Sequence, residues 1–141
     1  MPRHLGVHPK NIAAIVTDPS FPEFWKAAKE KWMDAVRRNK ELRLGVVICC
    51  DSGRHRSVAI AELLNRVGAR IYNMDVSRRD VCCRTWMHSL HQCAGGQCRE
   101  CNDDDVLRRR ALDYASELWY YDHVRVDSEA QHFLEEMQTH R

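Results

Sequence analysis

The sequence predicts a small α/β domain: a layered fold with a mainly parallel sheet at its centre. A continuous run of β-branched residues at Val46–Ile48 is typical of a strand covered on both faces. It is followed by a short polar loop containing Gly53 and then by apolar residues at helical spacing between Ile60 and Val67. The segment Ala69–Met74 predicts a second strand. Strand, helix and strand in so short a span imply a right-handed parallel crossover.

The first half of the chain also contains an amphipathic helix. Ser20 and Glu23 have the spacing of a capping box, and the apolar face that follows continues to Val36. Gly68 is expected to be the C-cap of the helix that follows the polar loop. The elements predicted in this half are a helix over Ser20–Val36, the central strand over Leu44–Cys50, a helix over Arg54–Val67 and the second strand over Ala69–Met74.

Beyond the second strand the apolar pattern is interrupted by a segment rich in cysteine, histidine and glycine. Asp103–Asp105 then supplies N-caps for a helix, and Ser128 caps a last amphipathic helix. A short strand over His123–Val126 is weakly indicated. We therefore expect a single domain over residues 1–141, with a core at about 3–76, a Cys/His-rich insertion at about 77–102 and C-terminal helices at about 103–141.

Composition narrows the class of protein. A net charge of +2 is too small to indicate a nucleic-acid partner. The chain has no apolar run long enough to cross a bilayer and no N-terminal segment of signal-peptide type, so we expect a cytoplasmic protein without a membrane partner. The seven cysteines are odd in number and locally clustered, which favours metal ligation or thiolate chemistry over a secreted disulfide framework.

The loop between the central strand and its helix carries the most informative chemistry. Free backbone N–H groups at a helix N-terminus, together with the helix dipole, favour an anion. Arg54, His55 and Arg56 add side-chain donors, and an arginine fork matches the oxygens of a phosphate. The pattern predicts an oxyanion cradle formed by Asp51, Ser52, Gly53, Arg54, His55, Arg56 and Ser57.

The segment Cys50–Glu62 closely resembles the C-terminal domain of the RapZ (YvcJ-like) family. The family pattern is Cys-x-Gly-Gly-x-His-Arg-Ser-Val-x-Ile-Ala-Glu, and this chain matches it densely from His55 onward. Leu5–Pro9 and Phe21–Val36 are similar to upstream elements of the same family. The resemblance covers about Arg3 to Val76.

This resemblance implies a phosphate- or phosphosugar-binding domain of sensor or adapter type. In bacterial members the ligand is glucosamine 6-phosphate, and the signal passes to partner proteins. By position, the ligand would contact residues Asp51–Arg56. Three departures qualify the carry-over, and one is that the first strand of the family's domain has no evident counterpart here, so that another element such as Val124–Val126 would have to complete the sheet. Asp51 and Ser52 place an acid where the family has small residues, and the Walker loop of the family's nucleotide-binding domain has no counterpart here, so we expect no nucleotide.

A cysteine-dependent phosphatase is the alternative function. Cys50 and Arg56 have the Cys-x5-Arg spacing in which a thiolate attacks phosphorus while the arginine holds the other oxygens. Low-molecular-weight phosphatases have a similar entry into the helix. Asp51 within the loop would repel a dianionic substrate and oppose thiolate formation, so we expect binding without turnover and interpret Cys49 and Cys50 as buried residues ending a strand. A further alternative is a protein-interaction module without a ligand.

The cysteine-rich insertion suggests a structural zinc site. Two cysteines in a C-x2-C pair can present thiolates to a tetrahedral ion, and nearby imidazoles can complete the ligand set. A loop with free thiols and a disulfide pair are the alternatives. The predicted ligands, chosen among several possible sets, are His88, Cys93, Cys98 and Cys101.

Several other conspicuous residues are expected to be structural. His8 is interpreted as a surface histidine, and Arg108–Arg110 as the exposed side of a helix. Trp25, Trp32 and Trp119 lie on apolar helix faces and are predicted to belong to the core.

Overall fold

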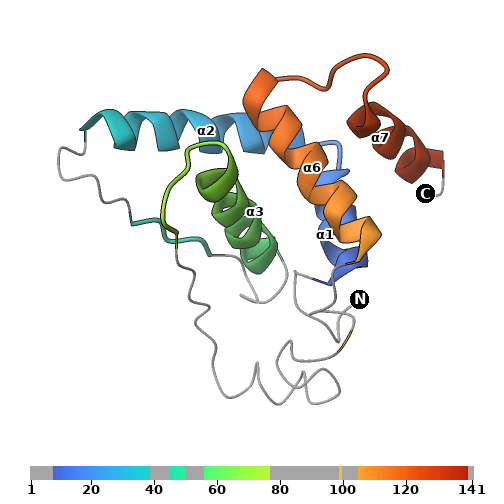
Figure 1. Ribbon diagram of the computed structural model, residues 1–141, viewed down its shortest axis with the longest axis horizontal. Coiled ribbons are helices and arrows are strands. Elements are labelled where there is room, and N and C mark those ends of the chain that lie inside the picture. The colour runs from blue at the N-terminus through green and yellow to red at the C-terminus, as the bar shows by residue number, and fades with distance from the viewer. Residues whose placement is uncertain (1–7, 39–44, 50–55, 77–98, 100–104, 140–141) are drawn as a thin grey trace.

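The computed structural model of the chain describes residues 8–38, 45–49, 56–76, 99 and 105–139. Their regular structure is helical, and no strand occurs among them (Figure 1). The helices are α1 (Pro9–Val16), α2 (Phe21–Arg38), α3 (Arg56–Arg70), α6 (Val106–Tyr121) and α7 (Glu129–Thr139).

The predicted α/β class with a parallel sheet is therefore wrong for the described part of the chain. Val47 is 94% exposed and Val46 is 49% exposed, so this run is not covered on both faces. Of the second predicted strand, residues 69–70 continue α3, and Asn73 has a positive φ of 50° that belongs to a turn. Residues 123–126 are irregular and form no strand.

The predicted helices agree better with the structure than the predicted strands do. α2 begins one residue after the predicted start and ends two residues after the predicted end, and α3 begins two residues after its predicted start. The caps of the last two helices are confirmed. The Asp105 carboxylate accepts hydrogen bonds from the N–H of Leu107 at 2.7 Å and of Arg108 at 3.3 Å. The Ser128 hydroxyl accepts one from the N–H of Gln131 at 3.1 Å.

α6 is the helix around which the others are arranged (Figure 1). It packs against α1, α2, α3 and α7, and one side of it is apolar at intervals of three and four residues. Its own buried residues are Ala111, Leu112, Tyr114, Ala115, Leu118 and Trp119. Ile12 and Val16 of α1, Leu63 and Val67 of α3 and Phe133 of α7 belong to the same continuous core.

Four aromatic rings join α2, α6 and the turn after α3. The Trp119 ring lies edge-on to Trp25, with centroids 4.8 Å apart, and edge-on to Trp32 at 5.8 Å. Trp32 in turn stacks on Tyr72 at 5.8 Å. Edge-to-face and stacked rings at these separations contribute beyond their buried area. The prediction that the three tryptophans belong to the core is confirmed.

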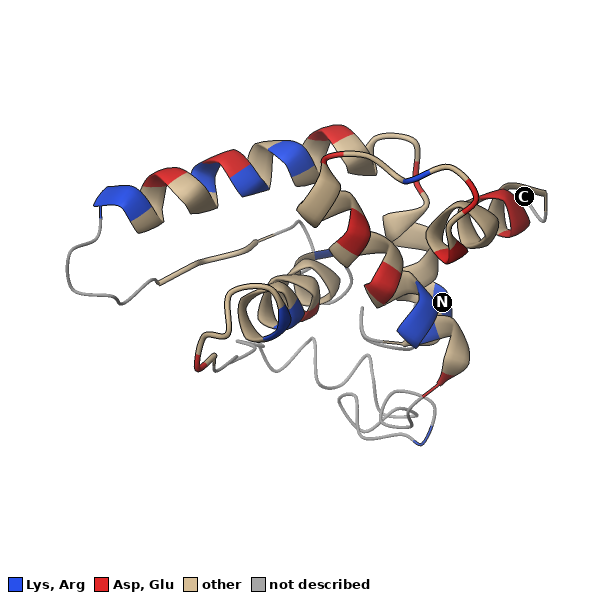
Figure 2. Cartoon of the chain, turned by 45° about the horizontal axis from the view of Figure 1, so that its top comes forward, with Lys and Arg blue, Asp and Glu red and all other residues tan. Residues whose placement is uncertain are grey.

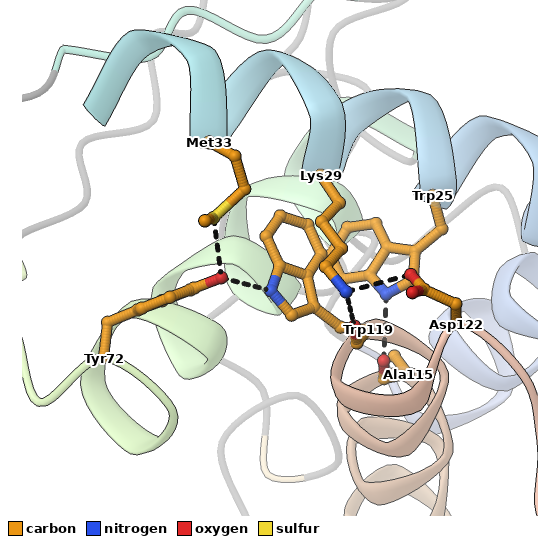
Figure 3. A network of polar contacts seen from close by, with 7 residues as sticks. All are labelled: Trp25, Lys29, Met33, Tyr72, Ala115, Trp119 and Asp122. Atoms are coloured by element: carbon orange, nitrogen blue, oxygen red, sulfur yellow. Dashed lines mark hydrogen bonds and ion pairs between the residues drawn. The ribbon is translucent and has the colours of Figure 1, made fainter. Parts of the chain in front are cut away.

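Hydrogen bonds fix the orientation of three of these rings, those of Trp25, Tyr72 and Trp119 (Figure 3). Trp119 Nε1 donates to the Tyr72 hydroxyl at 3.0 Å, and that hydroxyl donates to Met33 Sδ at 3.3 Å. Trp25 Nε1 donates to the Ala115 carbonyl at 2.9 Å. Two buried indole N–H groups thus find acceptors without water, as burial of a donor requires.

The C-terminus of α6 is capped by an ion pair. Asp122 has a φ of 63°, the left-handed conformation common just beyond a helix. Lys29 Nζ donates to the Asp122 carboxylate at 2.9 Å and to the Trp119 carbonyl at 2.6 Å (Figure 3). The hydrogen bond from Lys29 lowers the pKa of Asp122. The contact therefore supports the fold at neutral pH and is lost as the pH falls through this lowered pKa.

Gly68 is not a C-cap, because it lies buried within the last turn of α3. The chain folds back over it, and the Met74 N–H donates to the Gly68 carbonyl at 2.9 Å. A Cβ at this position would lie 2.8 Å from Val76 Cγ2 and 3.5 Å from Trp32 Cη2. The glycine is therefore needed for close packing and not for a special backbone conformation.

We expect Gly68→Ala to lower the free energy of unfolding by about 1 kcal/mol, because overpacking outweighs the gain in helix propensity. The matched background is Val76→Ala, which removes the clashing methyl group. In that background the same substitution is expected to be stabilising, and urea unfolding measures both differences. The same sign in both backgrounds would contradict the packing explanation.

Tyr72→Phe should cost about 1–3 kcal/mol, since it leaves the buried Trp119 N–H without its acceptor. Tyr120→Phe is the control, because the Tyr120 side chain is 62% exposed and its hydroxyl can bond to water. Thermal unfolding followed by circular dichroism compares the two variants. Equal melting temperatures would show that the Tyr72 hydroxyl does not anchor the indole.

Candidate functional site

The start of α3 is the described part of the predicted anion cradle. α3 begins at Arg56, whose side chain is exposed, and Ser57 in the same turn is 7% exposed. The first turn carries no acidic residue that would compete with an anion for the N–H groups. Val58, Ala59 and Ile60 anchor this turn in the core. The arrangement places an exposed arginine at a helix N-terminus that is held by buried residues, which suits phosphate recognition.

His8 is a buried residue at the start of α1. Its imidazole is 2% exposed, and Nδ1 accepts a hydrogen bond from the N–H of Lys10 at 3.3 Å. Nδ1 therefore carries no proton, and in the neutral ring the proton is on Nε2. His8 acts as the N-cap of α1, and Pro9 occupies the first position of the helix. The interpretation of His8 as a surface histidine is wrong.

α1 packs against α3, and in the view of Figure 1 both helices begin at the lower edge of the helical layer. The buried histidine and the exposed arginine thus belong to the starts of two helices in contact. Sequence reasoning missed α1 because the helix has only eight residues. The His8-Pro9 pair followed by Ile12, Ala13 and Val16 was the signal that could have found it.

The rest of the predicted cradle lies outside the described residues: Asp51, Ser52, Gly53, Arg54 and His55. The same holds for Cys50, the nucleophile of the phosphatase alternative. The neighbouring Cys49 is described and is an exposed free cysteine, so the interpretation of this residue as a buried strand end is wrong. Of the predicted site, the structure therefore places Arg56 and Ser57.

The zinc prediction gains no support from the structure. In the described part of the chain, no group of three or more histidine, cysteine, aspartate or glutamate side chains could hold a metal ion. The predicted ligands His88, Cys93, Cys98 and Cys101 lie outside the described ranges. The zinc site therefore stays a prediction, whereas the α/β fold expected around it is contradicted by the helical structure of the described residues.

Arg110 does more than form the exposed side of a helix. It makes an ion pair with Glu136 at 2.5 Å, and its guanidinium carbon lies 5.3 Å from the centroid of the Phe133 ring. These two contacts join α6 to α7.

Among the described helices, none combines the length and the apolar character needed to cross a membrane.

Because His8 acts as the N-cap of α1, His8→Ala should lower the free energy of unfolding by about 1–2 kcal/mol. His8→Asn keeps a side-chain acceptor for the Lys10 N–H and should retain most of the stability. Chemical denaturation of the two variants measures the difference. Equal losses would mean that the imidazole contributes through packing and not through the hydrogen bond.

Comparison with known proteins gives one match. The family model described as RapZ C-terminal domain matches residues 3–82, which is more than half of the chain. No curated protein and no solved structure gave a match. The matched region contains α1, α2 and α3 and includes the residues of the anion cradle. The chain belongs to the RapZ C-terminal domain family.

Proposed function

We propose that this domain binds a phosphorylated small molecule, with an amino-sugar phosphate as the preferred class, at the segment 51–57. Membership of the RapZ C-terminal domain family supports a ligand-binding or adapter role. The observation that carries the proposal is the start of α3, where an exposed Arg56 stands next to a helix N-terminus anchored by buried residues. A rigid N-terminus loses little entropy when it binds an anion.

The chemistry of the segment favours a phosphate ester over a carboxylate. Arg54, His55 and Arg56 are three adjacent donors, and a phosphate offers three peripheral oxygens where a carboxylate offers two. Asp51 is an acid in the same segment, and it suits a ligand that carries an ammonium group as well as a phosphate. An amino-sugar phosphate has both groups.

A regulatory role follows because ligand binding and the stability of the folded state are thermodynamically linked. A ligand that binds only the folded state stabilises it by about 2.7 kcal/mol at a concentration of one hundred times its Kd. The sensor signal would be this stabilisation of the helical layer at α3, passed to a partner protein. Such a role needs no turnover.

The test is a titration of the full chain with glucosamine 6-phosphate, with inorganic phosphate and glucosamine as the two half-ligands. We expect saturable thermal stabilisation by the complete ligand and weaker effects of each half. Arg56→Ala should weaken binding by about 2 kcal/mol, roughly thirtyfold in Kd, through loss of charge-assisted hydrogen bonds.

The matched control is Arg70→Ala at the other end of the same helix. Arg70 is half exposed and pairs with Asp113 at 3.2 Å, so its loss should leave ligand affinity unchanged. An equal loss in both arginine variants would point to nonspecific charge attraction and refute the proposed site. Release of phenol from an aryl phosphate that is lost in the Cys50→Ser variant would show phosphatase activity and would refute binding without turnover.

A further inference from the structure

A groove of about 490 Å³ lies between the second half of α6, the turn that follows it and the start of α7. It is distinct from the anion cradle, because none of its lining residues belongs to the segment 51–57 or to α3; Ile71 lies just beyond the C-terminus of that helix. The side chains that determine its chemistry are Asp113, Glu117, Tyr120, Tyr121, Arg125 and Glu129. The proposed function uses none of them.

One stripe of α6 forms the floor of the groove. Asp113, Glu117 and Tyr120 are spaced by four and three residues, so they lie on the same face of the helix. Figure 2 shows acidic residues at successive turns of α6 on the side turned to the viewer. The Tyr120 ring is 62% exposed and stands edge-on to Tyr121 at 4.7 Å. An exposed aromatic pair beside carboxylates is chemistry that suits a cation.

The groove already holds one guanidinium, from Arg125 of this chain. Arg125 Nη2 and Nε donate to Glu117 Oε1 at 2.7 and 2.9 Å, and the guanidinium carbon lies 4.6 Å from the centroid of the Tyr121 ring. Glu117 also accepts from the Ser128 hydroxyl at 2.9 Å. The Glu117 side chain is 10% exposed and is thus committed to this internal contact.

Asp113, Glu129 and Tyr120 are two exposed carboxylates and an exposed aromatic ring of the same lining. Asp113 is 64% exposed, and its pairing with Arg70 at 3.2 Å is between exposed side chains and therefore weak. Glu129 is exposed at the start of α7. Three carboxylates against Arg125 give the lining a net negative charge, and the charge stays negative when Arg70, the partner of Asp113, is counted as well.

We propose that this groove docks a basic segment of a partner protein, with an arginine or lysine side chain placed over Tyr120 and between Asp113 and Glu129. Charge complementarity selects this occupant, because the carboxylates repel nucleic acid and anionic membranes. The proposal adds to the phosphate-binding function a protein contact on a different part of the molecule. The two can fail independently, since the variants that test them do not overlap.

The experiment measures the fluorescence anisotropy of a labelled peptide of alternating arginine and leucine, titrated with the full chain at low ionic strength. We expect saturable binding that weakens as salt is added. The double variant Asp113→Asn with Glu129→Gln should weaken it about three- to tenfold. Tyr120→Ala should weaken it about two- to fivefold, whereas Tyr120→Phe should retain it.

The matched control is Glu30→Gln with Glu135→Gln, which removes the same charge from two exposed positions outside the groove. An equal effect of the two double variants would overturn the proposal in favour of general electrostatic attraction. Sedimentation of the chain alone provides the second readout. Self-association that the groove variant abolishes would show that a second copy is the occupant, which would also overturn it.

Discussion

Trp119 is the side chain on which the helical arrangement depends. Its ring touches Trp25 and Trp32 of α2, its N–H is bound to Tyr72 beyond α3, and its carbonyl accepts from Lys29. One residue near the end of α6 therefore connects three segments that lie far apart in the sequence. Since a large buried aromatic side chain contributes several kcal/mol, these contacts outweigh the exposed ion pairs of the same helices.

This framework places the functional features on different parts of the molecule. α6 and α1 support α3 along its length, so that the first turn of α3 is held in the core while Arg56 remains exposed. The acid-lined groove lies near the C-termini of α3 and α6. A ligand at the start of α3 and a protein at the groove would thus contact the same packed helices. For binding of the ligand and binding of the protein to be coupled, both must stabilise the same folded state.

The sequence predicted helices better than the overall class. Helical periodicity and capping residues found α2, α3, α6 and α7, because these signals are local. The strand prediction at Val46–Ile48 failed because β-propensity reports a fit to a half-buried sheet, and Val47 is almost fully exposed. The role of Gly68 depends on Trp32 and Val76, which no local pattern reveals. Of the candidate cradle, Arg56 and Ser57 lie in the first turn of a helix that begins two residues after the predicted start, and the residues before them remain a prediction.

The central claim is that an anion binds at the N-terminus of α3. The most direct test is a titration of the isotope-labelled chain with glucosamine 6-phosphate, followed by amide nitrogen–proton correlation spectra. The account predicts saturable shifts concentrated at the amides of Arg56, Ser57 and Val58, with little change at Arg70. Saturable shifts that leave the start of α3 unchanged, or no shifts at millimolar ligand, would contradict it.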